Sequence, residues 1–466
     1  MTNASTASAV PVFERIGARV AGNVQKWLPD PFLFAILLTF IAFAMGMIFA
    51  GKSAEQMVRH WYSGFWNLHT FAMQMVLILV TGYVLAHAPF IRQALNWLAD
   101  QPRTGTQGIV LVAVLALVVS WINWGFGLIV GAIMAVEVGK RAHTKGIPVH
   151  YPVLCTAGYA GLGVSWHWGL SGSAPLISNT KGHMFEKLIG IVPTSDTIFS
   201  GYAIWLTVLS LIYVPLILYL IAPKTADRCR GIEHWLPEAV KGGTGKEATA
   251  APKGDASWAD RINNSVILGG LTVVMGLVYI VMHFQVGRWY ERLDLNIVIF
   301  IFLIVGLALY LRPYQYLLAF YEAVKASAGV ILQFPFYAGI MGMIGLSGLG
   351  VIMAGWLISI ANPTTYPMMA WLAAGFVNLF VPSGGGEWAV LGETLLRAGQ
   401  NLGVPAGKTI IAFATGDAWT NLFQPFWAIA LLGLTGMRAR DMFGYCIVLM
   451  FALLPFFAIL LTWLPY

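Results

Sequence analysis

The chain has 466 residues, of which 58% are hydrophobic and only 10% charged, and its net charge is +7. Soluble globular chains carry about 25% charged residues, so this composition excludes a water-soluble protein and indicates a surface that lies in lipid. The modest positive charge is typical of the loops of membrane proteins and does not favour a nucleic-acid-binding protein. Three cysteines without short spacing indicate neither a disulfide framework nor a zinc site.

Apolar runs of about 20 residues, the length that crosses a bilayer, recur along the chain after a polar amphipathic segment at 1–31 that we expect in the cytoplasm. The continuous runs are 32–50, 70–87, 201–223, 264–283, 295–311, 326–345 and 442–463. The runs interrupted by glycine or polar residues are 108–137, 149–176, 367–397 and 408–434.

Basic residues orient these segments, because Lys and Arg concentrate on the cytoplasmic side. The central segment 224–263 has seven Lys/Arg and six Asp/Glu, and we expect it to be a flexible cytoplasmic loop. The basic clusters at 140–145 and 438–440 should also lie in the cytoplasm. All three regions can do so only if the segments 108–137 and 367–397 do not cross the membrane and are instead re-entrant hairpins. The predicted fold is an all-α polytopic membrane protein with about nine spanning helices plus two re-entrant hairpins, and a cytoplasmic N-terminus.

A series of polar residues, glycines and prolines occurs twice with nearly the same spacing. The first series is Asn123, Glu137, Gly146-Ile147-Pro148 and Gly158, and the second is Asn378, Glu393, Gly403-Val404-Pro405 and Gly416. This predicts two inverted repeats, at 32–223 and 284–466, joined by a linking transmembrane helix at 264–283. Inverted repeats of this kind are typical of secondary transporters.

Breaks in helical continuity predict the substrate site, because exposed backbone polar groups within a membrane are tolerated only where they are buried or line a cavity. Pro382 and the glycines that follow Ser383 cannot lie inside a continuous helix, and the N-terminus of a half-helix attracts anions. No arginine inside a predicted span suggests an anion clamp, which favours a substrate with one small carboxylate. The predicted substrate-binding residues are Asn123, Gly125, Gly127, Ser171, Ser173, Asn378, Ser383, Gly384, Gly385, Gly386 and Asn421.

Asp417 is an ionisable residue within a predicted transmembrane segment, which indicates a path for an ion or a proton. Thr420 and Asn421 lie about one helical turn further on, so we expect a coupling-ion site made by these residues and Glu387, with Na⁺ near Asp417 and Thr420 or with a proton instead. Alternatively, Asp417 caps a half-helix and Glu387 complements a helix N-terminus. His167 could relay protons, but we interpret it as a buried histidine bonded to a carbonyl.

Two strings resemble signatures of the short-chain fatty acid transporter family, FVPSGGGEWAVLGE at 380–393 and GDAWTNLFQPFWAI at 416–429. The string SAPLISNT at 173–180 is similar as well, and the resemblance covers nearly the whole chain. It implies uptake of short-chain fatty acids such as butyrate, and of acetoacetate. It also implies a wider ion-transporter group with the divalent anion/sodium symporters, which have re-entrant hairpins with Ser-Asn-Thr tips, homodimers and an elevator motion. Here the Ser-Asn-Thr at 178–180 follows the first broken helix instead.

The function predicted from the sequence is a multi-pass secondary active transporter of the cell inner membrane, moving small monocarboxylates with H⁺ or Na⁺. The alternatives are a channel and a transporter of another small organic anion, either a dicarboxylate or an amino acid. We expect no enzyme, because neither a Gly-x-Ser-x-Gly nor a His-x-x-x-His pattern is present. The expected partners are the anion, the lipid bilayer and a second copy of the chain, with no nucleic acid and no cofactor besides the coupling ion.

Overall fold

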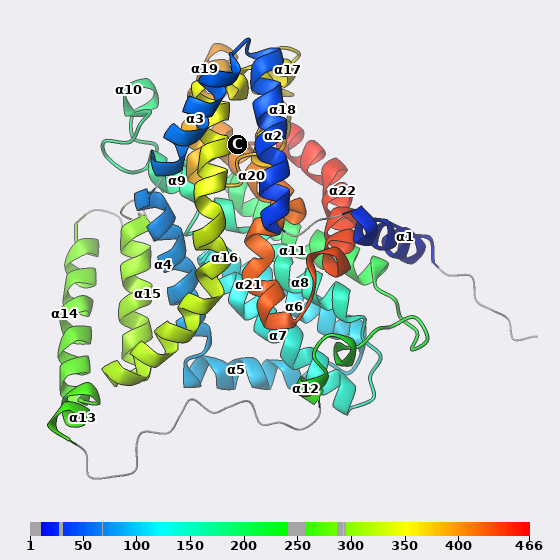
Figure 1. Ribbon diagram of the computed structural model, residues 1–466, viewed down its shortest axis with the longest axis vertical. Helices are drawn as coiled ribbons and strands as arrows, with labels where there is room; N and C mark the ends of the chain where they lie inside the picture. Colours follow the sequence, from blue (N-terminus) through cyan, green and yellow to red (C-terminus); the bar gives the residue numbers. More distant parts are fainter. Residues whose placement is uncertain (1–10, 28–30, 68, 241–256, 287–291, 293–294) are drawn as a thin grey trace, which may run out of the picture.

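The computed structural model describes residues 11–27, 31–67, 69–240, 257–286, 292 and 295–466, and every regular element in these ranges is helical (Figure 1). The elements before the central loop are α1 (Val12–Trp27), α2 (Pro31–Phe49), α3 (Ala54–Asn67), α4 (His69–Ala86), α5 (Pro89–Asp100), α6 (Gly105–Ile122), α7 (Trp124–Thr144), α8 (Tyr151–Val164), η1 (Trp166–Trp168), α9 (Ser173–Ser178), α10 (Glu186–Ile189), η2 (Thr194–Asp196) and α11 (Gly201–Ile221). The remaining elements are η3 (Ile232–His234), α12 (Pro237–Val240), α13 (Trp258–Asn263), α14 (Val266–Phe284), α15 (Leu295–Tyr310), α16 (Pro313–Leu346), α17 (Leu349–Ile358), α18 (Tyr366–Asn378), α19 (Gly384–Asn401), α20 (Ala406–Thr420), η5 (Asn421–Phe423), α21 (Pro425–Thr435) and α22 (Ala439–Trp463).

Five stretches of the described chain are long and apolar enough to cross a bilayer: α2, α6, α11, α13 with α14, and α22. Two more qualify if each of two bent pairs counts as one span. These pairs are α4–α5, bent by 70°, and α16–α17, bent by 72°. The structure therefore has five to seven candidate spans, which supports an all-α multi-pass membrane protein, while the count of nine stays a prediction.

The predicted apolar runs correspond to helices whose ends differ by a few residues, with two exceptions. The helix α16 begins at Pro313, well before the predicted run at 326–345, and it contains Pro335. The amphipathic helix α3 was not predicted, and it packs along α16. Two short helices, α5 and α17, lie in corresponding places, each directly after a bend of about the same angle.

Each segment predicted as a re-entrant hairpin forms two consecutive helices whose open ends are adjacent, and the re-entrant topology stays a prediction. At α6–α7, a Cβ on Gly105 would lie 2.2 Å from the carbonyl oxygen of Pro148, so the start of α6 contacts the segment after α7. At α18–α19, the hydroxyl of Tyr366 donates to the carbonyl oxygen of Leu395, which joins the start of α18 to the later turns of α19. Whether either pair enters and leaves the membrane on one side is a matter of topology, discussed below.

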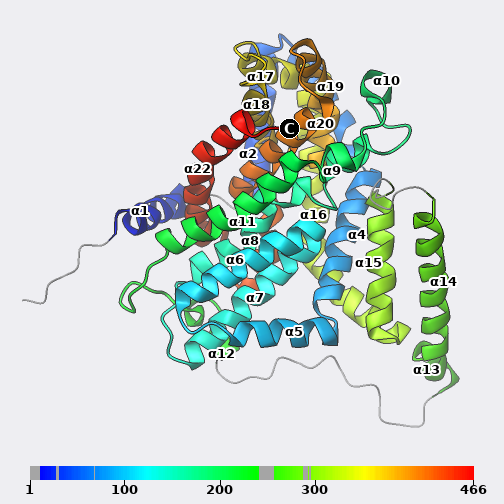
Figure 2. The same ribbon diagram turned by 180° about the vertical axis from the view of Figure 1, so that it is seen from behind.

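The interior of the molecule is built from both halves of the chain. Helices α6, α7, α8 and α11 lie together in Figure 2, and α18 packs closely against α20, which also contacts α8. The long helix α16 contacts α2, α3 and α4. The helices α14 and α15 lie at the edge beside α4 (Figure 1).

The first part of the predicted loop 224–263 packs against the helices instead of extending freely. Ile232 is fully buried, and the indole N–H of Trp235 donates to Oδ2 of Asp441 at 3.1 Å. The prediction of a flexible loop therefore does not describe this part. Residues 241–256 lie outside the described residues, and α13 follows them.

Candidate functional site

The tip of the second hairpin is joined to the broken helix α20–η5 by the amide of Asn378. Its Nδ2 donates to the carbonyl oxygen of Asp417 at 2.7 Å, to Oγ1 of Thr420 at 3.0 Å and to Oδ1 of Asn421 at 3.0 Å. The carbonyl oxygen can only accept, so the nitrogen of the Asn378 amide must face these three atoms. Four predicted site residues therefore lie together.

Asp417 forms a buried pair with a residue from the first half of the chain. Nδ1 of His167 lies 2.7 Å from Oδ2 of Asp417, and both side chains are almost completely excluded from solvent. The backbone N–H of Ala174 donates to Nε2 of His167 at 3.2 Å. Because Nε2 accepts, the proton of the neutral ring is on Nδ1, which donates to Asp417.

The His167 side chain is therefore not the carbonyl-bonded histidine expected from the sequence. Its partner is the predicted coupling-ion residue, and its ring is held from several sides. The indole of Trp166 stacks on it at a centroid distance of 4.3 Å, and Phe413 meets it edge-on. A Cβ on Gly384 would lie 2.6 Å from Cε1 of His167, so only glycine allows the hairpin tip this close.

Glu387, in the first turn of α19, is fully buried beside Asp417. The two carboxyl groups lie close enough to interact electrostatically. Neither oxygen of Glu387, nor Oδ1 of Asp417, has a hydrogen-bond donor among the described residues when both acids are ionised. Buried polar atoms are almost always bonded in native proteins, so these three oxygens mark a place where a proton or a cation is needed.

The tip of the first hairpin is a single residue, Asn123, which ends α6 and begins α7. Its Oδ1 accepts from the N–H of Phe126 at 2.9 Å and caps α7, while its Nδ2 is buried without a partner among the described residues. The hydroxyl of Ser171, in the broken segment after η1, accepts from the N–H of Trp124 at 3.0 Å. Residues from the two predicted breaks of the first half are thus joined.

Tryptophan side chains connect the two tips. The ring of Trp124 packs edge-on against Trp166 and against Trp427, with centroid distances of 6.2 and 5.0 Å. A Cβ on Gly384 would lie 3.0 Å from Cη2 of Trp166, and the indole N–H of Trp427 donates to the carbonyl oxygen of Pro382 at 2.9 Å. The sequence analysis did not select these tryptophans, although Trp166 lies beside His167 in the string SWHWG.

Several buried donors around these tips have no hydrogen-bond partner among the described residues. The indole N–H groups of Trp124 and Trp166 are unpaired, as is the Ser173 hydroxyl. The set at the two tips and the breaks includes Asn123 Nδ2, Trp124 Nε1, Trp166 Nε1, Ser173 Oγ, Ser178 Oγ, Ser383 Oγ, Trp388 Nε1 and Asn421 Nδ2. N–H and O–H groups in this number form a region suited to a carboxylate.

The glycines of the predicted site differ in what they contact. Gly125 lies against the backbone of Ile78 in α4, and Gly127 against Ser120 in α6, so both allow close packing of helices. Gly386 lies beside Ser383 at the second tip, and Gly385 is buried in the same first turn of α19.

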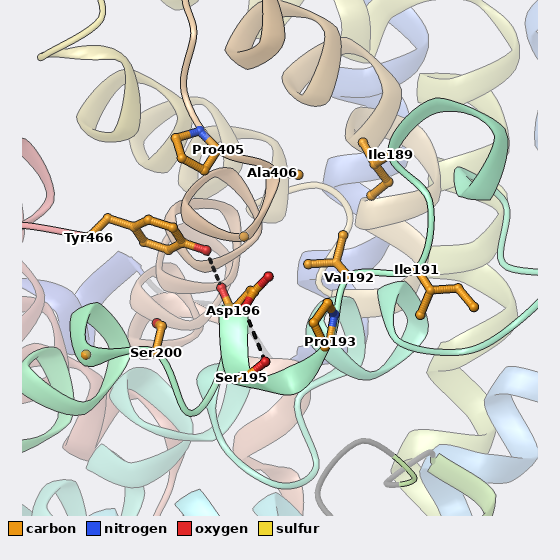
Figure 3. A pocket seen from close by; sticks show the side chains of 12 residues that line it. Ile189, Ile191, Val192, Pro193, Ser195, Asp196, Ser200, Pro405, Ala406 and Tyr466 are labelled. Atoms are coloured by element: carbon orange, nitrogen blue, oxygen red, sulfur yellow. Dashed lines mark hydrogen bonds between the residues drawn. The ribbon is translucent and has the colours of Figure 1, made fainter. Parts of the chain in front are cut away.

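A wide pocket lies elsewhere and contains none of the predicted site residues (Figure 3). It has a volume of about 530 Å³ and is lined by the segment 189–201, the start of α20 and Tyr466. Within it, the Tyr466 hydroxyl donates to the carbonyl oxygen of Asp196. A much smaller cavity, of about 10 Å³, adjoins Val381, Pro382 and Ser383 at the second tip.

Comparisons with known proteins agree with the sequence signatures. A family model described as "Short chain fatty acid transporter" matches residues 12–464. A protein of Escherichia coli (strain K12) with the provisional name short-chain fatty acid transporter is 38% identical over 433 residues, which are 93% of this chain and 96% of that protein. A protein of Haemophilus influenzae (strain Rd) with the same provisional name is 37% identical over 457 residues, 96% of this chain and 99% of that protein.

Two solved structures are similar at low identity. The YdaH transporter of Alcanivorax borkumensis has a TM-score of 0.47 and 15% identity, covering 92% of this chain and 98% of that one. MtrF of Neisseria gonorrhoeae, described with a class of antimetabolite efflux pumps, has a TM-score of 0.45 and 14% identity, covering 95% and 97%. These likenesses are too distant to inform the site.

The apolar helices, the broken helices that meet at a buried polar centre and the matched relatives define a multi-pass membrane transporter, not an enzyme. Within that class, the chain belongs to the short-chain fatty acid transporter family, whose model it matches over nearly its full length.

Proposed function

We propose that this protein is a secondary active transporter of short-chain fatty acids and related monocarboxylates, such as butyrate and acetoacetate, across the cell inner membrane. A gradient of H⁺ or Na⁺ drives it. The observation that carries the proposal is the group of buried N–H and O–H donors without partners at the two hairpin tips, which Trp166 and Trp427 connect. The names of the matched relatives point to the same class of substrate.

The carboxylate of the substrate accepts from these donors. Asn123 and Trp124 supply N–H groups from the first tip, Trp166 supplies one from the broken segment, and Ser383 supplies a hydroxyl from the second tip. The N-terminus of α19 adds its dipole, because first-turn N–H groups lack intrahelical acceptors. Among the described residues, no Lys or Arg side chain is buried, which suits one carboxylate better than two.

The alkyl chain of the substrate has an apolar place beside the same tip. A small cavity of about 10 Å³ adjoins Ser383 and Pro382, and its other walls are apolar or aromatic. They are Phe334, Tyr337, Ala338, Met341, Val381 and Phe426. Burying each methylene group there contributes about 0.8 kcal/mol. The cavity is too small for butyrate in this closed conformation, so α16 and the tip separate when the substrate enters.

The topology that we propose has nine spans and two re-entrant hairpins, α6–α7 and α18–α19, in inverted repeats. The adjacent open ends of each hairpin and the matching bends at α4–α5 and α16–α17 support it. The N-terminus lies in the cytoplasm, because the basic residues of 140–145 and of 224–240 then lie there too. The protein works as a homodimer, as in the wider transporter group that its signatures resemble.

Transport of radiolabelled butyrate into liposomes containing the purified protein tests the function. With equal pH and equal Na⁺ on both sides, vesicles preloaded with butyrate should take up labelled butyrate by exchange, well above protein-free vesicles. Unlabelled acetoacetate and propionate should compete, whereas succinate and alanine should not. Exchange of succinate or alanine in place of butyrate would overturn the proposal and favour a different organic anion.

A further inference from the structure

Three titratable side chains from three separate elements meet at the centre of the site. His167 comes from η1, Glu387 from α19 and Asp417 from α20, and each has an exposed fraction of 0%. Two ionised carboxylates that lie close together repel each other strongly when water is excluded. The arrangement therefore requires a positive charge, either as a proton or as a metal cation.

The contacts of His167 show that it does not provide this charge. Its Nε2 accepts the N–H of Ala174 and its Nδ1 donates to Oδ2 of Asp417, so the ring is neutral. Protonation at Nε2 would make that nitrogen a donor, and it would then face the N–H of Ala174, which is also a donor. The histidine thus fixes Oδ2 of Asp417, whereas Oδ1 has no donor among the described residues.

The burial of Glu387 next to α20, with no donor for either of its carboxyl oxygens among the described residues, fits an acid that shares one proton with Asp417. Its carboxyl group lies close enough to that of Asp417 to interact electrostatically, and Oδ1 of Asp417 likewise has no donor in the described part of the chain. A single proton between the two groups forms an O–H···O⁻ bond, which is short and strong because one partner is ionised. Aspartic protease dyads show the same principle in soluble proteins.

The oxygen atoms expected to bind sodium are instead hydrogen-bonded to the side chain of Asn378. The carbonyl oxygen of Asp417, Oγ1 of Thr420 and Oδ1 of Asn421 all accept from Nδ2 of Asn378. An N–H donor thus takes the place that a cation would need among these oxygens, and the amide cannot be turned round without setting Oδ1 against the Asp417 carbonyl. In this conformation these neutral oxygens face a hydrogen-bond donor, which favours a proton over a sodium ion at this place.

The surrounding elements bring no other acid or base to the pair. The helices α8, α9, α17 and α18 contain no Asp, Glu, His, Lys or Arg. The hydroxyl of Tyr159 in α8 donates to the carbonyl oxygens of Asn421 and Gln424, and that of Tyr337 in α16 donates to the Gln424 side chain. The charged residues of α16, Glu322 and Lys325, are exposed and paired with each other, and Asp441 of α22 is bound to Arg438.

We propose that the coupling ion is one proton, shared by Glu387 and Asp417, with His167 as the residue that positions Asp417. This inference rests on the proposed function and names its coupling ion and the site that holds it. The proton binds from the outside together with one carboxylate anion and leaves on the inside with it. One positive and one negative charge then cross together, so transport is electroneutral.

The experiment compares exchange with accumulation in sodium-free liposomes. Butyric acid crosses lipid unaided, so the protein-dependent rate is the difference from protein-free vesicles at the same pH gradient. The test variant is Glu387→Gln, whose amide N–H replaces the shared proton and cannot leave. The matched control is Glu393→Gln on the same helix, where the side chain is 59% exposed and paired only with Arg397.

The wild-type protein should accumulate butyrate with an acidic exterior, with no effect of Na⁺ or of an imposed membrane potential. In Glu387→Gln, the accumulation should fall by about tenfold or more while exchange at equal pH falls much less, and Glu393→Gln should retain both. Asp417→Asn, which also keeps the shape of its side chain, should behave like Glu387→Gln. Sodium-dependent accumulation, or unchanged accumulation by Glu387→Gln, would overturn the proton site. Absence of butyrate exchange by the wild type would instead overturn the proposed function.

Discussion

The imidazole of His167 has both ring nitrogens bonded, Nε2 to the Ala174 N–H and Nδ1 to the Asp417 carboxylate. A hydrogen bond to an ionised group contributes about 1.5–3 kcal/mol, more than a bond between neutral groups. The histidine therefore determines where the negative charge of Asp417 lies. It also holds the broken segment of the first half against α20.

Two substitutions at His167 separate positioning from simple filling of space. His167→Asn keeps an amide N–H near the place of Nδ1, whereas His167→Leu leaves Oδ2 of Asp417 without a donor. We expect the leucine variant to lose proton-driven butyrate uptake by about tenfold, corresponding to one lost charged hydrogen bond, and the asparagine variant to regain most of it. The dependence of uptake on pH should also change in the leucine variant only.

The control for this comparison is His143→Leu, since His143 is partly exposed and its ring contacts only Glu233 as an ion-pair partner. It should leave uptake and its pH dependence unchanged. Equal uptake by His167→Asn and His167→Leu would show that the ring fills space and does not orient Asp417.

Residue patterns in the sequence identified Asp417 as a site residue but did not identify His167 as its partner. Asp417 stood out because an acid inside an apolar segment is costly, and Asn378 because it precedes a proline and three glycines. The role of His167 could not be predicted, because its partner is 250 residues away and only the folded chain brings them together. The same holds for Trp124 and Trp427, which meet across the two halves.

At the scale of elements, α16 lies against the second hairpin tip. Ala338 and Met341 of this helix face Ser383 across the small apolar cavity. In the proposed function, this part of α16 contacts the alkyl chain and limits its length. The residues at this contact therefore determine which fatty acids fit.

Ala338→Leu should fill the cavity and shorten the preferred substrate. Overpacking of this kind costs about 1–3 kcal/mol, so the ratio of butyrate to acetate uptake should fall by about tenfold, while Met341→Ala should raise hexanoate uptake. The measurement is the initial rate of exchange for each fatty acid. The matched control is Ala328→Leu, the same substitution at an exposed position of the same helix. An unchanged ratio in Ala338→Leu would place the alkyl chain elsewhere.

Element positions followed from hydropathy where helices are apolar on all sides. The helices α2, α4, α11, α14 and α15 match predicted runs closely, because about 20 apolar residues leave few alternatives. The helix α3 was missed because it is amphipathic, and its packing on α16 is a tertiary contact. The first half of α16 contains the exposed pair Glu322–Lys325, so this part of the helix is not apolar enough to be predicted from hydropathy.

At the scale of the whole molecule, the topology can be read from the open ends of the two hairpins. A variant with Cys229→Ser leaves only two buried cysteines. On this background, single cysteines at Arg103 and Lys145 flank α6–α7, and those at Asn362 and Asn401 flank α18–α19. A maleimide that cannot cross membranes should label the first two only from the cytoplasmic side and the other two only from the outside.

The Cys229→Ser variant without any added cysteine serves as the control for labelling and should remain unlabelled from either side. Labelling of Arg103→Cys and Lys145→Cys from opposite sides would show that α6 or α7 is a full span. The same result at Asn362 and Asn401 would remove the second re-entrant hairpin and, with it, the inverted symmetry of the two halves.

In the proposed transport cycle, the unpaired donors at the two tips also affect how fast the protein returns without its substrate. Each buried polar group without a partner costs about 1–3 kcal/mol, so a closed transporter without its anion is several kcal/mol less stable than a loaded one. After delivering its substrate, the protein must pass through that state to return. In this proposal, the return of the empty carrier limits net uptake. Fatty acid on the far side of the membrane then accelerates the cycle, because the carrier returns with a bound anion and avoids the empty closed state.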